Sequence, residues 1–381
     1  MELLISNYIN KMIAKQLADQ QGSLGISIYP DKSTFEDDKA YIELAAKYGF
    51  TKIFTALLNV KPDNAEEMFA RIKKIGAVAK ANSMELMLDI GPQVFMMLNI
   101  AVDDVTFFTD LGATGIRLDI GFGPEKDAAL TRNEKGISIE VNASFPNTIE
   151  SIMECQPNID NLVACHNYFP QKYTGLGEKL FEDCNKRIKR HGVKIAAFVC
   201  TKNEDNFGVW EVSEGLCTLE VSRQMSTDLQ TRHLWAFGDI DQVIVGDTYA
   251  TEAELLAMSK ARPKVATMRI EVTESNSEIE NEILFANYHA ARNDMSDYMA
   301  RSIVSRLTHS KNDFPANNTR DLKRGDVVIC NNGYGQYKAE LQLVLQEMEN
   351  DGNKNVVARV IEEELFLLDY ITPGKPFAFI K

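Results

Sequence analysis

The feature that most constrains the fold of this chain is a short apolar run of β type that ends in polar or glycine-rich residues. Stretches with helical spacing separate the runs, and the unit recurs every ~25–35 residues, the size of a βα unit. Eight runs predict a closed TIM (β/α)8 barrel of the α/β class, in which the polar ends gather on one face. Six show the polar end clearly and two are plainer; together they cover residues 24–30, 52–58, 85–92, 115–121, 137–144, 161–170, 193–200 and 241–247.

A second domain is expected because 381 residues exceed one typical barrel. After Arg262-Pro263 the βα pattern gives way to strand-like runs at 265–272, 281–290, 326–332, 336–348 and 355–363, with one helix near 294–307. The expected organisation is an N-terminal extension at 1–21, the barrel at 22–262 and a small β domain at 263–381.

Composition narrows the function classes. The formal net charge of −14 argues against a broad nucleic-acid surface but leaves room for a local cationic pocket. The six cysteines show no CxxC pair and no metal-ligand spacing, which favours reduced, cytosolic residues over a disulfide framework. No run approaches the ~20 apolar residues of a membrane helix, and the N-terminus has no secretory signal. We expect a cytoplasmic protein without a metal or other cofactor that binds neither nucleic acid nor membrane.

Two helix starts in the barrel region have the pattern of a capping box. Ser33, Thr34 and Glu36 precede the first helix, and Thr251 and Glu254 follow the eighth run. Strand, polar end, cap and helix therefore follow one another in the same order at the beginning and at the end of the barrel.

Charged and amide groups end the third, fourth and fifth runs. Asp89 and Asp119 each lie two residues before a glycine, and Arg117 points to the same side of its strand as Asp119. One interpretation is an Arg–Asp pair that fills the barrel interior. The other makes Asp119 a catalytic or substrate-orienting carboxylate that the Arg117 cation keeps ionised. We expect Asn142 to meet a ligand and Glu140 to lie a layer deeper, where a charge needs a partner or a function.

The sixth run ends in the densest cluster of hydrogen-bonding groups in the chain. His166, Asn167 and Tyr168 follow one another there, and the next loop contains Lys172 and Thr174. Loops carry function where a rigid scaffold positions them, so all five residues are candidates for ligand binding.

Two further carboxyl groups follow the seventh and eighth runs. Glu220 comes after a long connection whose length and glycine suit a lid or binding loop, and Asp247 stands at the expected barrel mouth. Each has a structural alternative: Glu220 as a first-turn helix acid and Asp247 as a helix N-cap.

In the β domain, Arg292 and Arg301 lie in basic and aromatic clusters, which form either a solvated face or an anion clamp for the barrel mouth.

In combination, these runs resemble the 6-phospho-N-acetylmuramidase family of bacteria. The resemblance rests on GISIYPDKSTFEDDKAYIELAAKYGF, GIRLDIGFG, ISIEVNAS, HNYFPQKYTGLG, EGLCTLE and VIVGDTYATEAEL, in that order, and continues through GYGQYKAELQLVL. It implies a TIM barrel followed by a cyclophilin-like β-barrel domain. It also implies an intracellular glycosidase that hydrolyses the β-1,4 bond between N-acetylmuramic acid 6-phosphate and N-acetylglucosamine in cell-wall recycling.

Glycoside hydrolysis usually needs two carboxyl groups, one protonated and one ionised. We expect Asp119 to be the ionised group and Glu220 or Asp247 to be the acid. The only expected partner is the phosphorylated amino-sugar disaccharide, and the sequence does not determine the oligomeric state. The substrate-binding candidates are Asp89, Arg117, Asn142, His166, Asn167, Tyr168, Lys172, Thr174, Arg292 and Arg301.

Three other functions are compatible with a barrel and a β domain. A pyridoxal-phosphate enzyme of the alanine-racemase type needs a Schiff-base lysine, which no predicted strand end clearly offers. A metal-dependent isomerase or lyase acting on a sugar phosphate would lose its activity to a chelator. A non-catalytic surface or binding protein is the third alternative, and the absence of a signal and of an anchor argues against it.

Overall fold

The structure, a computed structural model, describes residues 21–286, 289–302 and 304–381. These divide into two compact units, one of Gly22–Leu234 with Asp239–Ala261 and one of Arg262–Lys381 with Trp235–Gly238. Apart from Gln21, the N-terminal extension expected at 1–21 lies outside the described residues.

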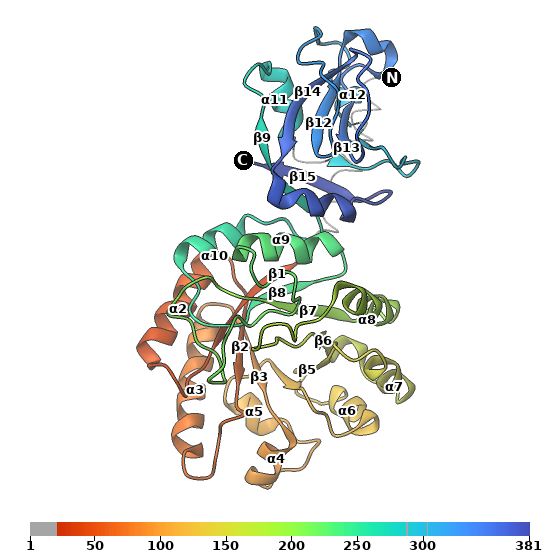
Figure 1. The fold of residues 1–381 in the computed structure, drawn as a ribbon. Coiled ribbons are helices and arrows are strands. Elements are labelled where there is room, and N and C mark those ends of the chain that lie inside the picture. Colours follow the sequence, from red (N-terminus) through yellow and green to blue (C-terminus); the bar gives the residue numbers. More distant parts are fainter. Residues whose placement is uncertain (1–20, 287–288, 303) are drawn as a thin grey trace. The chain divides into compact units, whose positions relative to one another are not determined.

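The first unit is a closed barrel of eight parallel strands, in which each strand pairs with the next and β8 pairs with β1 (Figure 1). Each strand overlaps one of the eight apolar runs, so the predicted α/β barrel is confirmed. The strands are β1 Ser23–Ile28, β2 Lys52–Ala56, β3 Glu85–Asp89, β4 Gly115–Leu118, β5 Ser138–Asn142, β6 Leu162–Cys165, β7 Lys194–Val199 and β8 Gln242–Val245.

Helices occupy the connections between the barrel strands (Figure 1). Thr251 and Glu254 form the predicted capping box at the start of α10. The cap of α2 lies one residue later than expected: Thr34 accepts from the N–H of Asp37, because the Ser33 hydroxyl instead donates to Tyr29 O and Asp38. The helices are α2 Phe35–Lys47, α3 Ala65–Ala81, α4 Pro92–Leu98, α5 Thr106–Asp110, α6 Pro124–Thr131, α7 Thr148–Glu154, the 3-10 turn η1 Ile159–Asn161, α8 Glu178–Arg190, α9 Thr227–Phe237 and α10 Glu252–Ser259.

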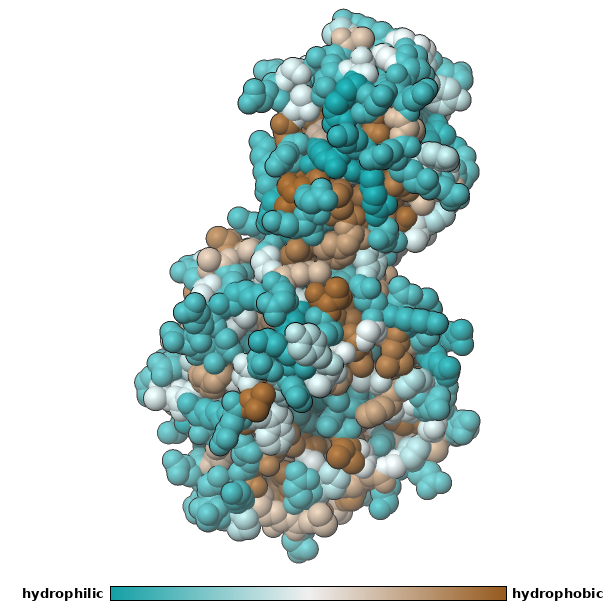
Figure 2. All heavy atoms as spheres, viewed as in Figure 1, coloured by the Kyte–Doolittle hydropathy of each residue, from teal (hydrophilic) through white to brown (hydrophobic). Residues whose placement is uncertain are grey.

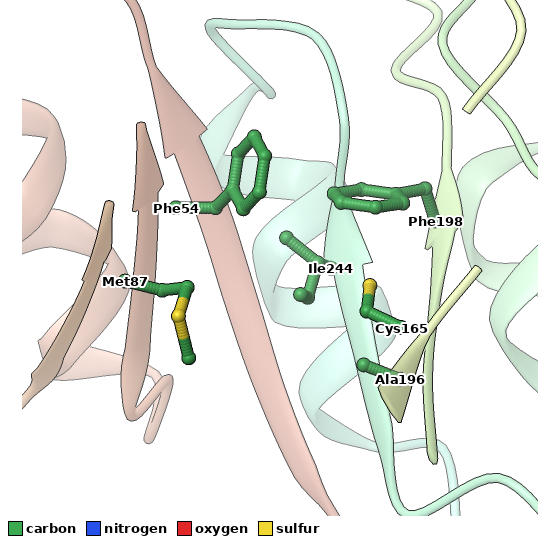
Figure 3. Packing of buried hydrophobic residues seen from close by; sticks show 6 residues of the cluster. All are labelled: Phe54, Met87, Cys165, Ala196, Phe198 and Ile244. Carbon is green, nitrogen blue, oxygen red and sulfur yellow. The ribbon is translucent and has the colours of Figure 1, made fainter. Parts of the chain in front are cut away.

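An apolar cluster fills the centre of the barrel. Its side chains point toward one another from β2, β3, β6, β7 and β8 (Figure 3), and they are Phe54, Met87, Cys165, Ala196, Phe198 and Ile244. The rings of Phe54 and Phe198 meet edge to face with centroids 5.2 Å apart. Complete burial of one such ring stabilises the fold by about 1.5–3 kcal/mol. The barrel interior is therefore a packed core and not a pore.

The second unit is built on a seven-stranded sheet with the order β10-β15-β9-β14-β12-β13-β11. The sheet is nearly closed, since the N–H of Arg292 after β10 donates to Arg301 O of β11 at the other end of that order. This architecture agrees with the small C-terminal β barrel that was expected. Its elements are β9 Ala266–Val272, α11 Glu278–Leu284, β10 His289–Ala290, β11 Met299–Ser302, α12 Val304–His309, β12 Asp326–Cys330, η2 Asn332–Tyr337, β13 Leu341–Val344, β14 Lys354–Val360, η3 Glu362–Tyr370 and β15 Pro376–Ile380.

Three local predictions in the second unit were wrong. The strand expected at 281–290 begins within helix α11, because Ser277 and Glu280 form a reciprocal capping box, and among its described residues only His289 and Ala290 are strand. The helix expected near 294–307 begins only with α12, because the preceding residues pair with β13 as strand β11. The strand expected at 336–348 shrinks to β13, since the 3-10 turn η2 occupies the chain before it.

Candidate active site at the carboxyl ends of the barrel strands

Arg117 is the centre of a charged cluster at the carboxyl ends of β3, β4 and β5. Strand register places it beside Asp89 on one side and Glu140 on the other. Its guanidinium lies 3.9 Å from Asp89, 3.4 Å from Asp119 and 3.5 Å from Glu140. It also donates to Cys165 O (3.0 Å). One buried cation therefore holds three carboxyl groups from three neighbouring strands.

Glu140 lies at the deep side of this cluster, as expected. It is fully buried and forms an ion pair with Lys52, whose Nζ is 2.7 Å from Oε2. Burial alone would raise the pKa of Glu140, but the charges of Lys52 and Arg117 outweigh burial and hold the pKa below its ordinary value. Glu140 is therefore an ionised structural group that fixes Arg117 from below.

Asp119 is the open carboxylate of the cluster. Its side chain is 42% exposed, whereas those of its neighbours on the barrel interior are buried. Asn142, the last residue of β5, donates to Asp119 Oδ1 (2.9 Å), and its own Oδ1 accepts from the N–H of Ser144 (2.8 Å). Arg117 and Asn142 therefore position Asp119 from two strands while leaving it accessible.

Asp89 ends β3 on the other side of Arg117. Only 4% of the residue is exposed, and Oδ1 has no hydrogen-bond partner among the described residues. Burial raises the pKa of Asp89 to about 7, against the opposing effect of Arg117; Asp119 and Glu140 add to the rise. Asp89 thus differs from Asp119 in both exposure and electrostatic environment.

His166 is buried behind the site. Its ring lies against Phe181, and its nitrogens contact Ser144 Oγ (3.4 Å) and Asn185 Oδ1 (2.8 Å). Burial lowers the pKa of His166 to about 4, so the ring is neutral near pH 7. Full burial argues against direct ligand binding by His166, which stays a prediction. Its contact with Ser144 instead helps to position that residue, whose Oγ accepts from the N–H of Asn167 (2.9 Å).

The two residues after His166 face the cluster. Asn167 accepts a short hydrogen bond from Arg117. The ring of Tyr168 packs edge-on against Phe54 and Phe198, so it caps the apolar core, and burial raises the pKa of its hydroxyl. The structure therefore brings Asp89, Arg117, Asp119, Asn142, Asn167 and Tyr168 together, as the sequence predicted.

Glu220 is fully engaged by protein groups. Arg223 donates to both of its oxygens (2.8 and 2.6 Å), and the N–H of Gly175 donates to Oε2 (2.8 Å). These bonds, those to Arg223 first, hold the pKa of Glu220 at about 2. Glu220 as the acid stays a prediction, and the low pKa argues against it, because a proton donor must be protonated near the working pH.

Asp247 is fully buried two residues after β8. Its oxygens accept the N–H groups of Thr201 (2.7 Å) and Leu216 (3.1 Å), which belong to the long connection after β7. Burial raises the pKa of Asp247 to about 6, although these bonds favour its charged form. These contacts anchor the connection and leave neither oxygen of Asp247 unbound, which argues against Asp247 as the acid; that role stays a prediction. Asp247 is not a helix N-cap, since Thr251 caps α10.

The loops after β6 and β7 are joined to each other. Phe169 pairs with Cys217 and Leu176 pairs with Leu219 as isolated bridges. Arg223, which the sequence reasoning missed, is buried and donates to Phe169 O (2.9 Å) as well as to Glu220. The only local signal for it was its spacing of three residues from Glu220. Lys52 was also missed, because a lysine at the first position of an apolar run is usually solvated.

The remaining binding candidates are exposed or belong to the second unit. Lys172 lies 3.4 Å from Glu214, and the Thr174 hydroxyl donates to Gln171 O (2.7 Å). In the second unit, both side-chain oxygens of Asp294 bind Arg292, and those of the buried Glu340 bind Arg301. A role for these four cationic or hydroxyl groups in substrate binding stays a prediction.

Three large apolar side chains are exposed on the loops that follow the carboxyl ends of the barrel strands. Ile120, Phe145 and Tyr173 lie on the loops after β4, β5 and β6, and all are more than half exposed. Figure 2 shows hydrophobic residues scattered among hydrophilic ones on the face of the barrel that it displays. Aromatic and apolar side chains beside hydrogen-bonding groups suit a sugar ring, which has apolar faces and polar edges.

The described residues offer neither a metal-binding cluster nor a membrane-spanning helix. No group of three or more His, Cys, Asp or Glu side chains is arranged to hold a metal ion. Within the same described ranges, every helix is too short or too polar to cross a membrane.

Family models match nearly the whole chain. The N-terminal model of 6-phospho-N-acetylmuramidase matches residues 24–260, and the C-terminal model of the same family matches residues 266–380. The chain belongs to the 6-phospho-N-acetylmuramidase family. The resemblance stated from the sequence motifs is thereby confirmed.

Two solved structures are similar to this member of the 6-phospho-N-acetylmuramidase family. An uncharacterized B. cereus protein is 41% identical, with a TM-score of 0.83, and the match covers 95% of this chain and 100% of that chain. A conserved Enterococcus faecalis protein of unknown function is 26% identical, with a TM-score of 0.64 and coverage of 94% and 96%. No curated protein matches the chain.

Proposed function

We propose that the protein is a glycosidase that hydrolyses the β-1,4 bond between N-acetylmuramic acid 6-phosphate and N-acetylglucosamine. The observation that carries the proposal is the match of both family models, which together span the barrel and the second unit. The carboxyl cluster around Arg117 supports it, because glycoside hydrolysis needs two carboxyl groups in different protonation states beside the bond.

Asp119 is the ionised carboxylate in this proposal. Arg117 and Asn142 bind the Oδ1 atom of Asp119, and the exposed remainder of the side chain is free to face the anomeric carbon or its attacking water. A negative charge at this position stabilises the oxocarbenium-like transition state of glycoside cleavage.

Substrate binding would use the groups around this carboxylate. Asn167 binds Arg117, and Tyr168 lies beside it on the same segment. Lys172 and Thr174 on the exposed loop after β6 are the candidates for binding an anionic substituent. His166 contributes by holding Ser144.

The proposal places the reaction in cell-wall recycling in the cytoplasm. All six cysteines are unpaired, and five of them are buried, which fits a reducing compartment.

The test is incubation of the purified protein with the phosphorylated and the unphosphorylated disaccharide, followed by measurement of released N-acetylglucosamine. We expect release from the phosphorylated compound and less or none from the other. A chelator should leave the rate unchanged; loss of activity would favour the metal-dependent isomerase or lyase instead. No release from either disaccharide would reject the proposed function.

A further inference from the structure

The carboxyl groups at the barrel mouth differ in how many donors they already accept. Glu220 and Asp247 use both oxygens on protein groups, and Glu140 is neutralised by two cations. Asp119 is held by Arg117 and Asn142. Asp89 is the exception, since its Oδ1 is buried and accepts no hydrogen bond from the described residues.

A buried oxygen that accepts no hydrogen bond is costly for an ionised carboxylate, because the hydrogen bonds to water are lost and only the ion pair with Arg117 at 3.9 Å compensates for them. A protonated carboxyl has no net charge and carries an O–H that can be donated to a ligand. The environment of Asp89 therefore suits the protonated form.

Charge balance in the cluster leads to the same conclusion. Lys52 and Arg117 supply two positive charges, and Glu140 and the ionised Asp119 supply two negative charges. The cluster is neutral when Asp89 holds a proton, and it has one excess buried negative charge when Asp89 is ionised.

The groups that face Asp89 from the neighbouring elements explain why Arg117 does not keep it ionised. Arg117 favours the charged form from 3.9 Å, but it is shared with Asp119 and Glu140, whose charges oppose a third anion. The Tyr168 hydroxyl faces Asp89 from the loop after β6 and contributes no charge near pH 7. The raised pKa of Asp89 agrees with this arrangement.

We infer that Asp89 is the proton donor of this site, paired with Asp119 on the adjacent strand. The inference rests on the proposed glycosidase function. It replaces Glu220 and Asp247, which the sequence had suggested for the role.

The Asp89 carboxyl gives its proton to the glycosidic oxygen while the bond from C1 to that oxygen breaks, and the bonding electron pair stays on the oxygen of the departing N-acetylglucosamine. Asp119 stabilises the positive charge at C1. One water then adds to C1, and the proton that it loses restores the Asp89 carboxyl, directly or through solvent.

The experiment compares two substrates that share the 6-phospho-N-acetylmuramyl group. One is the disaccharide, whose sugar leaving group needs a proton; the other is the nitrophenyl glycoside, whose leaving group departs without one. For Asp89→Asn, kcat/KM on the disaccharide should fall about 10²–10⁴-fold, while kcat/KM on the nitrophenyl glycoside should stay within about tenfold of wild type. The wild-type rate on the disaccharide should decline above pH about 7.

Asp247→Asn is the matched control, because Asp247 is also a buried aspartate with a raised pKa but both of its oxygens are occupied. Any loss in this variant comes from displaced loops and should affect both substrates by the same factor. Thermal unfolding of each variant verifies that it is folded at the assay temperature.

Two results would overturn the inference: an equal loss on both substrates in Asp89→Asn, or an unchanged rate on the disaccharide. If the wild-type protein cleaves neither substrate, the proposed function itself fails and the role of Asp89 fails with it. If the wild type cleaves both and only the selective loss is missing, the function stands and the assignment of the donor is wrong.

Discussion

The barrel mouth has two sides that contain the same acidic residue types in different surroundings. On the side of β3 to β5, Asp89 and Asp119 share one arginine, and one of them is open to solvent. On the side of β7 and β8, Glu220 and Asp247 accept hydrogen bonds at both oxygens from arginine or backbone N–H groups. A carboxylate whose lone pairs are used by the protein supports structure, whereas one with unused lone pairs is free to act on a ligand.

The difference extends to the loops. On the β7 side, Arg223 and two isolated bridges join the connections after β6 and β7 into one unit. On the β4 side, Ile120 and Phe145 are exposed on the loops after β4 and β5. If the two sides differ in function as they differ in contacts, variants on the β3 to β5 side should lose catalysis and variants on the β7 and β8 side should lose stability.

The largest expected effect is on catalysis. Asp119→Asn should reduce kcat/KM on the phosphorylated disaccharide about 10²–10⁴-fold, because it removes the charge opposite the developing cation. Thermal stability should change little, since the side chain is 42% exposed. Steady-state kinetics checks the first statement, and Asp160→Asn, an exposed acid on η1, serves as the control. A near wild-type rate for Asp119→Asn would remove the β3 to β5 side from catalysis.

A large effect on stability is expected on the other side. Asp247→Ala leaves the N–H groups of Thr201 and Leu216 buried without acceptors, which should lower the free energy of unfolding by about 2–4 kcal/mol. Asp247→Asn should cost less, because its amide oxygen still accepts one of the two bonds. Chemical denaturation of both variants provides the measurement. If Asp247→Ala is as stable as wild type, Asp247 does not anchor the connection.

Asp89 should change the pH dependence of stability. Its pKa in the folded protein is about 7, above the ordinary 3.8. The protonated side chain therefore contributes fully to the free energy of unfolding below pH ~4, and this contribution is lost as the pH rises to about 7. Asp89→Asn cannot ionise and escapes this loss. The difference in free energy of unfolding between Asp89→Asn and wild type should therefore shift in favour of the variant by on the order of 2–4 kcal/mol between pH 4 and pH 8. Unfolding curves at several pH values measure the difference, and a constant difference would show that Asp89 is ionised throughout.

Glu220 should change the pH dependence of stability by a smaller amount than Asp89 and in the opposite direction. Its pKa in the folded protein is about 2, below the ordinary 4.5, so its stabilisation is present above pH ~4.5 and is lost as the pH falls through about 2. Glu220→Gln should lower stability at pH 7 by about 1 kcal/mol, since a quarter of the side chain is exposed and solvent screens the pair. Turnover of the disaccharide should stay within about tenfold of wild type. A loss of the size expected for Asp119→Asn would return Glu220 to the catalytic candidates.

The second unit shows where local signals were present but were given too little weight. Ser277 and Glu280 have the spacing of a capping box, so α11 could have been recognised from sequence. Strand β11 could not, because the short run Met299–Ser302 pairs with β13, about 40 residues further along the chain. Short segments take their structure from such partners rather than from intrinsic preference.

The sequence by itself determined the barrel, because eight repeated apolar runs give a signal that each unit carries locally and that the repetition reinforces. It also placed Asp89, Asp119 and Asn142 at strand ends, since alternation along a strand decides which side chains face inward. Only the tertiary structure decided which carboxyl groups were already occupied. The donors to Glu220 and Asp247 come from residues up to 46 positions away, and the ion pair of Glu140 joins strands that are 88 residues apart. Burial and partner number are properties of the folded assembly of strands, and these two quantities separate a catalytic carboxylate from a structural one.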